Sequence, residues 1–293
     1  MDRYSQVLKE SNVPTDKEEI RNALEKISEK IKDYKNEETY RKIFNCIDLT
    51  TLNTTDSQDS VTGFIQRVND FDNEYPQYPN VAAVCVFSNF AGLVRSALEV
   101  TGVKIAVVAG GFPSGQTFTA VKVADAALAV SEGADEVDVV MNLGMLRDGN
   151  YEELCDELIE VKHAIKDAHM KVIIESGALR DAEQIRNASI LAMYSEADFI
   201  KTSTGKVYEG ASPEAAYVMC RCIKEYYEKT GRKVGFKAAG GVRKAEEALL
   251  YYAIVKEVLG DEWLDNSLFR IGASSLANSI LASMLDEAEV KYF

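Results

Sequence analysis

Two lysines and one aspartate interrupt segments that otherwise have the composition of buried strands. Asp138 lies within the run 136–140, and Lys201 and Lys237 each follow a short run of apolar residues. A charged side chain inside a buried strand carries a desolvation cost, so its presence needs an explanation. Because side chains alternate along a strand, both lysines are able to face the interior of one sheet. These three residues are therefore the first candidates for chemistry.

A lysine in a strand is more often the structural partner of a carboxylate than a catalyst. Two ammonium groups packed together repel each other unless one of them is neutral, and a neutral lysine is a nucleophile. Such an amine attacks a carbonyl, and the resulting iminium ion accepts electrons when the adjacent carbon–carbon bond is cleaved or formed. We expect Lys201 to form the Schiff base, Lys237 to be the neighbouring cation, and Asp138 to transfer protons as a general acid and base.

A second group of residues is suited to holding a phosphate group. Glycine lets the backbone approach an oxyanion closely, and the N-terminus of a helix presents unpaired N–H groups. One Gly-Gly pair is weak evidence, but three such loops after neighbouring strands are stronger, although a serine there can also act only as an N-cap. The residues expected at the phosphate are Thr204, Gly205, Lys206, Gly240, Gly241, Gly272, Ser274 and Ser275.

These residues follow a regular alternation of strand-like and helix-like segments. The amphipathic stretches include 119–132, 150–167, 181–195 and 212–229, and the β-branched runs are 43–49, 81–87, 105–109, 137–141, 172–175, 199–202, 234–237 and 269–272. Parallel strands need long connections, so this alternation indicates a parallel sheet covered by helices. Eight units predict an α/β fold, a (β/α)8 TIM barrel with its active site at the C-terminal ends of the strands. The alternative is a doubly wound open sheet, but the glycine-rich turn typical of that fold is missing after 43–49.

The first forty residues are rich in charge and poor in strand formers. Thr15 and Glu18 indicate a capping box, and apolar residues then recur at helical spacing, at Ile20, Ala23, Leu24, Ile27 and Ile31. We predict an N-terminal helical extension over residues 1–40 and a catalytic barrel over residues 41–293. The apolar face of the helix is expected to cover the bottom of the barrel or to contact a second subunit.

Composition excludes several classes of partner. The chain has 33 Lys and Arg against 47 Asp and Glu, a net charge of −14, which disfavours nucleic acid and anionic membranes as partners. No apolar run is long enough to span a bilayer. Five cysteines without regular spacing, and no apolar N-terminal run, indicate a cytoplasmic protein with reduced thiols. Its two histidines, His163 and His169, lack the spacing of a helical metal pair, so no metal site is expected.

Six segments together resemble the deoxyribose-phosphate aldolase family. They are 48–52, 133–139, 172–175, 198–206, 235–243 and 272–275, and the resemblance extends over about residues 43–285. The longest motif, 199–206, is highly specific. The main departures are the N-terminal extension and the segment 87–90, where many members have a Tyr-Pro pair.

The resemblance implies reversible retro-aldol cleavage of 2-deoxy-D-ribose 5-phosphate to D-glyceraldehyde 3-phosphate and acetaldehyde, without a metal or organic cofactor. It assigns Lys201, Lys237 and Asp138 the same roles as above. It also implies that Asp48 and Thr50 contact the sugar hydroxyls and that Cys85 lines the pocket. Members of the family commonly form homodimers, and in some a C-terminal tyrosine enters the active site. For Tyr292, the penultimate residue, a frayed terminus is the expectation.

Two other functions remain open at this point. One is a different Schiff-base aldolase on the same barrel that uses another aldehyde acceptor. The other is a barrel without catalytic activity that binds a sugar phosphate, a reading disfavoured by the presence of Lys201 and Asp138.

Overall fold

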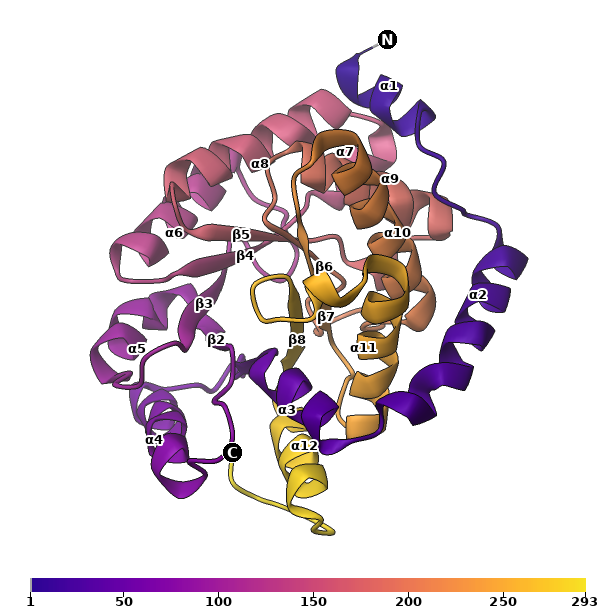
Figure 1. The fold of residues 1–293 in the computed structure, drawn as a ribbon. Helices are drawn as coiled ribbons and strands as arrows, with labels where there is room; N and C mark the ends of the chain where they lie inside the picture. The colour runs from indigo at the N-terminus through magenta and orange to yellow at the C-terminus, as the bar shows by residue number, and fades with distance from the viewer. Residues whose placement is uncertain (1) are drawn as a thin grey trace.

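The computed structural model describes residues 2–293 and contains a closed barrel of eight parallel strands in chain order (Figure 1). The strands are β1 (Ile47–Thr50), β2 (Ala83–Phe87), β3 (Lys104–Ala109), β4 (Glu136–Val140), β5 (His169–Ile173), β6 (Phe199–Lys201), β7 (Gly235–Ala239) and β8 (Phe269–Ala273). Pairing of β1 with β8 closes the barrel. The predicted (β/α)8 fold is thereby confirmed.

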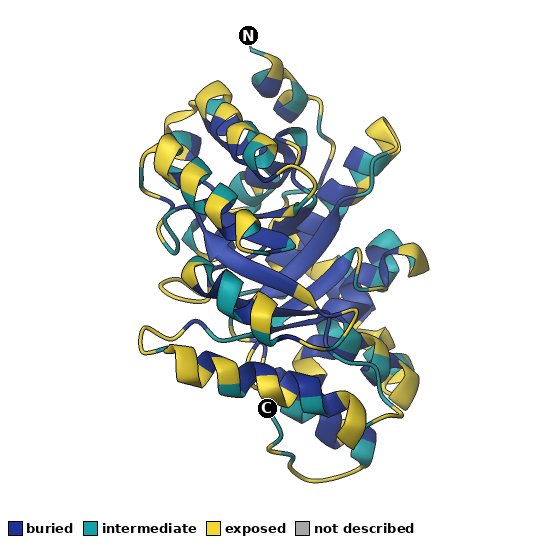
Figure 2. Ribbon diagram, turned by 90° about the vertical axis from the view of Figure 1, so that its left-hand side faces the viewer, coloured by how far each residue is buried: buried dark blue, intermediate teal, exposed yellow. Residues whose placement is uncertain are grey.

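Helices surround the barrel and cover the outer face of its strands. They are α4 (Gln58–Glu74), α5 (Ala91–Ala97), α6 (Thr119–Ser131), α7 (Leu143–Asp148), α8 (Tyr151–Ile165), α9 (Ala182–Tyr194), α10 (Pro213–Thr230), α11 (Ala245–Leu259) and α12 (Leu276–Leu285). Figure 2 shows the strands buried and the exposed residues confined mainly to the outward faces of the helices and to loops. This separation is the expected result of amphipathic helices packing on a sheet that is buried on both faces.

The prediction for the first strand was wrong over its first half. Residues 43–45 belong to helix α3 (Glu37–Asn45), and β1 begins only at Ile47. Asn36 caps this helix, its side chain accepting a hydrogen bond from the Thr39 amide at 3.0 Å. Tyr40, Ile43 and Phe44 are buried at helical spacing. A continuous apolar run does not distinguish a buried helix end from a strand, which explains the error.

The N-terminal segment forms α1 (Arg3–Lys9) and α2 (Lys17–Lys30). The N-cap of α2 is Asp16, whose carboxylate accepts hydrogen bonds from two backbone amides of the first turn, so the capping box predicted at Thr15 was wrong. Helix α2 buries Ile20, Leu24 and Ile27, as its spacing predicts.

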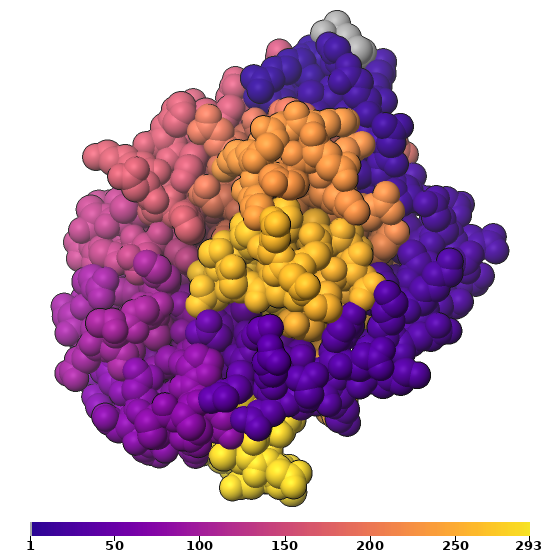
Figure 3. All heavy atoms as spheres, viewed as in Figure 1, coloured from indigo at the N-terminus to yellow at the C-terminus, as the bar shows by residue number. Residues whose placement is uncertain are grey.

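The extension lies along the side of the barrel and not across its bottom. Helix α2 packs against α10 and α11, and Figure 3 shows the indigo N-terminal segment along one side of the molecule. Glu225 on α10 accepts hydrogen bonds from Ser11 and Asn12, and Glu257 on α11 accepts them from Lys30 and Tyr34. The division into an extension over 1–40 and a barrel over 41–293 remains an interpretation, since α3 runs through residue 40.

The C-terminus is ordered, in contrast to the frayed end expected from the sequence. The amides of Tyr292 and Phe293 donate to the Asn278 side chain at 3.1 and 2.9 Å, and the Tyr292 hydroxyl donates to the Arg67 carbonyl. The Tyr292 ring packs edge-on against Phe71 of α4. Within residues 2–293, no helix has the length and apolar character needed to cross a bilayer.

The barrel interior has two chemically distinct halves. Small apolar side chains fill the part near β1 to β3, namely Leu52, Ala83, Cys85, Ala106 and Val108. The half formed by β4 to β8 contains the ring of Phe199, which fills the space beside Gly235 on the neighbouring strand. Apart from Asp48 on β1, the charged residues described next lie in this second half.

Candidate active site

Asp138 lies at the centre of a cluster of charged side chains inside the barrel. The Nζ atoms of Lys201 and Lys237 each donate a hydrogen bond to Asp138 Oδ2 at 2.7 Å. The lysines are paired in register on β6 and β7, and Asp138 reaches them from β4. The structure therefore brings together all three residues that sequence analysis selected for chemistry.

Three more buried charges adjoin this group, and sequence analysis assigned none of them to the site. Lys171 on β5 donates to Asp138 Oδ1 at 3.1 Å and also to Glu136. Arg270 on β8 donates to Glu136 Oε1 at 2.8 Å and to Asp48 Oδ1 at 2.7 Å. Glu136 and Arg270 are charged residues within apolar runs, the same signal that identified Asp138. Lys171 was missed because the fifth strand was predicted to begin one residue after it.

The cluster contains more positive than negative groups. Each member is at most 3% exposed; the carboxylates are Asp48, Glu136 and Asp138, and the cations are Lys171, Lys201, Lys237 and Arg270. Full ionisation gives four positive and three negative charges, a net charge of +1. Burying an uncompensated charge is costly, so the cluster is favoured when one lysine loses its proton.

Lys201 is the lysine whose environment favours the neutral amine. Burial is the largest cause that lowers its pKa, and repulsion by Lys237 acts in the same direction against the attraction of Asp138. The lowered pKa predicted from the sequence rested on the neighbouring cation alone, whereas burial is the larger cause. Burial also disfavours charge on Lys237, but Asp138 and Asp48 outweigh it and raise its pKa. Lys237 therefore keeps its proton while Lys201 is able to act as a nucleophile.

The Asp138 carboxylate is ionised in this environment. Burial alone favours the neutral acid, but the ammonium groups of Lys171, Lys201 and Lys237 hold its pKa well below the ordinary value. It is a hydrogen-bond acceptor at rest, able to take a proton from a group that enters beside Lys201.

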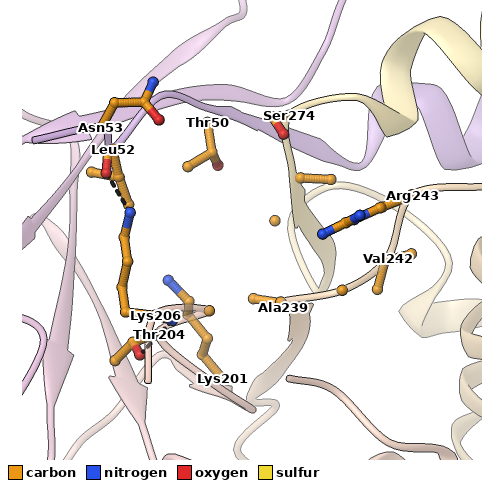
Figure 4. Close-up of a pocket in the computed structure, with 15 residues that line it drawn as sticks. Thr50, Leu52, Asn53, Lys201, Thr204, Lys206, Ala239, Val242, Arg243 and Ser274 are labelled. Atoms are coloured by element: carbon orange, nitrogen blue, oxygen red, sulfur yellow. Dashed lines mark hydrogen bonds between the residues drawn. The ribbon is translucent and has the colours of Figure 1, made fainter. Parts of the chain in front are cut away.

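Lys201 opens into a cavity of about 330 Å³ at the C-terminal ends of the strands (Figure 4). Among the predicted residues, the cavity is lined by Thr50, Lys201, Thr204, Gly205, Lys206, Gly240, Gly241, Gly272 and Ser274. Asp138, Lys237, Asp48 and Cys85 are not part of this lining. They lie deeper, where Asp48 accepts hydrogen bonds from Lys237 and Arg270.

Cys85 is 1% exposed and belongs to the apolar half of the barrel. Burial raises the pKa of its thiol, which favours the protonated form. Ser275 is exposed, precedes α12, and makes no side-chain cap. Neither Cys85 nor Ser275 therefore lines the cavity.

Glycines allow the loops at the cavity mouth to touch. Gly205 and Gly240 have φ angles of +72° and +83°, in the left-handed region that favours glycine. A Cβ on Gly240 would lie 2.9 Å from the Cα of Gly210 and 3.1 Å from that of Gly205. Thr204 is fixed by buried Glu175, which accepts hydrogen bonds from its hydroxyl at 2.6 Å and its amide at 3.0 Å. The loop after β6 is therefore held in place beside the loop after β7.

Two cations line the mouth of the cavity. Lys206 donates to the carbonyl oxygen of Leu52, and Arg243 extends toward the cavity in Figure 4. Sequence analysis included Arg243 in a motif but not among the binding residues. Together these cations supply the local positive charge that a phosphorylated ligand needs in a protein of net charge −14.

The barrel and its buried lysine pair belong to a segment that matches a known protein family. The model of the DeoC/LacD aldolase family matches residues 43–280. The chain therefore belongs to the DeoC/LacD family of aldolases, which are lyases.

The chain is 41% identical over 254 residues to human deoxyribose-phosphate aldolase, an alignment that covers 82% of this chain and 78% of the human protein. The solved structure titled "QR15, an Aldolase" has 29% identity and a TM-score of 0.67, covering 83% of this chain and 98% of that one. The tetrameric deoxyribose phosphate aldolase from Aeropyrum pernix shares the fold at 23% identity and a TM-score of 0.66, over 87% and 97% of the two chains.

Proposed function

We propose that this protein is a deoxyribose-phosphate aldolase that cleaves 2-deoxy-D-ribose 5-phosphate to D-glyceraldehyde 3-phosphate and acetaldehyde through a Schiff base on Lys201. The observation that carries the proposal is the position of Lys201, at the floor of the cavity and in contact with a carboxylate shared with Lys237. The similarity to human deoxyribose-phosphate aldolase supports the choice of substrate.

The first stage forms the Schiff base. The neutral amine of Lys201 adds to the C1 aldehyde of the open-chain sugar, and loss of water then gives the iminium ion. Lys237 stays protonated next to it, and Asp138, within hydrogen-bond distance of both lysines, receives and returns the protons of this step.

The second stage breaks the C2–C3 bond. Removal of the proton from the C3 hydroxyl releases glyceraldehyde 3-phosphate, and the electron pair of the bond moves to the iminium to form an enamine. Asp138 accepts this proton, directly or through a water molecule, and protonation of C2 regenerates an iminium. Hydrolysis of this iminium consumes one water molecule, which balances the water lost when the Schiff base formed, and releases acetaldehyde and the lysine amine. The iminium is the electron sink, so the proposed cycle includes no metal or organic cofactor.

We assign the phosphate of the substrate to the mouth of the cavity. Backbone amides of the loops after β6, β7 and β8 and the charges of Lys206 and Arg243 provide its binding site. Thr50 lines the same cavity from β1 and is assigned to a sugar hydroxyl. Asp48, held by Lys237 and Arg270, is assigned a role through Lys237 rather than direct contact with the sugar.

The proposal also covers the oligomeric state of the protein and its location in the cell. A homodimer is supported by the exposed apolar side chains of Phe118, Val121 and Leu128 on and beside α6, which are 82%, 49% and 64% exposed. A cytoplasmic location is supported by the five cysteines, all of which are unpaired. Sedimentation velocity and fractionation of cells test these two statements.

Borohydride reduction tests the catalytic assignment. Treatment of the protein with deoxyribose 5-phosphate and borohydride should convert the Schiff base to a stable secondary amine on Lys201, detected by peptide mass mapping. Lys201→Leu should abolish the adduct and the activity. Lys104→Leu, which replaces an exposed lysine at the start of β3, is the matched control and should keep both.

Other outcomes separate the rival functions. An adduct on Lys237 in place of Lys201 would reverse the two assignments. Labelling of Lys201 by a different aldehyde or sugar phosphate, but not by deoxyribose 5-phosphate, would favour another Schiff-base aldolase. Binding of the sugar phosphate without any adduct would favour a barrel that lacks catalytic activity.

A further inference from the structure

A group of charged side chains lies below the lysine pair and does not reach the cavity. We call Lys171, Glu136 and Arg270 the lower tier. The proposed mechanism assigns no step to any of them. Burying three charged side chains is costly, and an ion pair of this kind is often no more stabilising than apolar residues of similar size. Their presence therefore calls for a role other than stability.

The lower tier is supported by an aromatic ring and connected to the site by hydrogen bonds. Lys171 Nζ and Arg270 Cζ lie 5.8 and 5.7 Å from the centroid of the Phe199 ring, within the range of cation–π attraction. Lys171 binds Oδ1 of Asp138, while Oδ2 accepts from both Lys201 and Lys237. One carboxylate is thus shared by three ammonium groups.

The sharing of Asp138 decides how much negative charge acts on Lys201. If Lys171 were neutral or absent, the cluster would contain three carboxylates and only two other cations, and a proton on Lys201 would bring the net charge to zero. With Lys171 charged, the same proton raises the net charge to +1. A protonated Lys201 therefore neutralises the cluster when Lys171 carries no charge. When Lys171 is charged, the same proton gives the cluster an excess positive charge.

The charge count covers the buried cluster, and other titratable groups lie around it. β3 contributes only apolar residues to the interior, and Lys206 and Arg243 lie at the mouth of the cavity. The buried titratable or charged groups on the other strands are Asp48 on β1, Cys85 on β2, Glu136 and Asp138 on β4, Lys171 on β5, Lys237 on β7 and Arg270 on β8. His169 on β5 also faces the cluster, with its Nδ1 3.9 Å from Glu136 Oε1. Glu175, just after β5, is buried against Thr204.

We propose that Lys171 and Glu136 are positioning residues whose opposite charges, together with Arg270, fix the charge balance around Lys201 and keep it a free amine. The inference rests on the proposed Schiff-base function of Lys201. Neither residue lines the cavity. Lys171 acts through Asp138, and Glu136 acts through Lys171 and Arg270.

The test is the pH dependence of kcat/KM for cleavage of deoxyribose 5-phosphate. Activity requires neutral Lys201, so it falls as the pH drops through the pKa of this lysine. Lys171→Met removes a positive charge, favours the protonated form of Lys201 and raises that pKa. The acid limb of the pH profile should therefore move to higher pH by about one to two units, as expected for a like charge that shares the same carboxylate. Activity should recover as the pH is raised.

Two controls make the test specific for charge. Lys171→Arg keeps the positive charge and should leave the acid limb within about half a unit of the parent protein, a margin well below the shift expected above. The double variant K171M/E136Q removes one charge of each sign and should return the limb toward its original position. Arg270→Gln removes a positive charge from another strand and should shift the limb upward like K171M, so the test does not depend on the folding of a single variant.

The inference is overturned if K171M and R270Q lower activity by the same factor at every pH, or if K171M/E136Q fails to reverse the shift. Borohydride labelling separates this failure from failure of the proposed function. If the parent protein forms no adduct on Lys201, the Schiff-base function itself is wrong. If Lys201 is labelled but the acid limb does not move in either single variant, only the role of the lower tier is wrong.

Discussion

The carboxylate of Asp138 illustrates how much a single residue reveals before the structure is known. Its charge within an apolar strand predicted a functional position, and the same reasoning selected Lys201 and Lys237. Glu136 and Arg270 carried the same signal, but nothing in their own strands indicated a partner on the opposite side of the barrel. Arg270 and Glu136 are 134 residues apart in sequence, so their contact exists only because the barrel closes.

The two cations at the cavity mouth lead to a prediction at the residue scale. Lys206→Ala and Arg243→Ala should each raise the KM for deoxyribose 5-phosphate by roughly 10-fold to 100-fold, the loss expected for one charge-assisted hydrogen bond. The kcat should change much less, because the phosphate is bound equally in ground and transition states.

Steady-state kinetics with deoxyribose 5-phosphate and with unphosphorylated 2-deoxyribose check this prediction. The variants should equal the parent protein on the unphosphorylated sugar. Lys244→Ala, which changes an exposed lysine next to Arg243 but outside the cavity lining, is the matched control. An equal loss of activity on both sugars would mean that the two cations do not act by binding the phosphate group.

The bounds of the strands that carry the site were predicted to within a few residues. The errors lie at the ends of these strands. The second half of the first strand was correct, but its first residues form the end of α3, because Ile43 and Phe44 are buried equally well on a helix. The start of β5 was placed too late, so that Lys171 was not recognised. Periodicity identifies an element reliably, whereas its ends depend on capping and on tertiary contacts.

The contact between β6 and β7 gives a prediction at the element scale. Gly235 leaves room for the Phe199 ring, since a Cβ there would overlap the ring atoms. Gly235→Ala should lower the free energy of unfolding by about 1 to 3 kcal/mol, as overpacking in a core does. It should also disturb the cations that rest on that ring.

Chemical denaturation measures this change, with Gly63→Ala as the control. Gly63 lies within α4 and has no atom within 4 Å of its added Cβ. An alanine there should be neutral or stabilise the helix by up to about 1 kcal/mol. Equal stability of the two variants would show that the space beside Gly235 is larger than the packing indicates.

For the molecule as a whole, both ends of the chain pack on the outside of the barrel. The N-terminal helices contact α8 to α11, and the last residues pack against α4 and α12. The interior of the barrel, by contrast, is filled by the charged and apolar halves described above. The ends are therefore expected to affect stability more than chemistry.

The C-terminal tyrosine provides the prediction at this scale. Tyr292→Phe removes only the hydrogen bond to the Arg67 carbonyl, so it should cost at most about 1 kcal/mol of stability and leave kcat and KM unchanged. Removal of residues 292 and 293 should lower the melting temperature further, because the contact with Phe71 is also lost. Thermal unfolding and steady-state kinetics check both variants. A tenfold or larger loss of kcat in Tyr292→Phe would mean that the tyrosine enters the active site during turnover.

The sequence by itself determined the repeating strand and helix pattern, the closed barrel, and the three charged residues that sit where apolar residues belong. It could do so because periodicity and the cost of burying charge are local properties of each segment. Only the tertiary structure decided which charges meet: Lys171 on Asp138, Arg270 on Glu136, and Asp48 on Lys237. Strand register and barrel closure set those distances, and the ionisation of Lys201 depends on the sum of all of them.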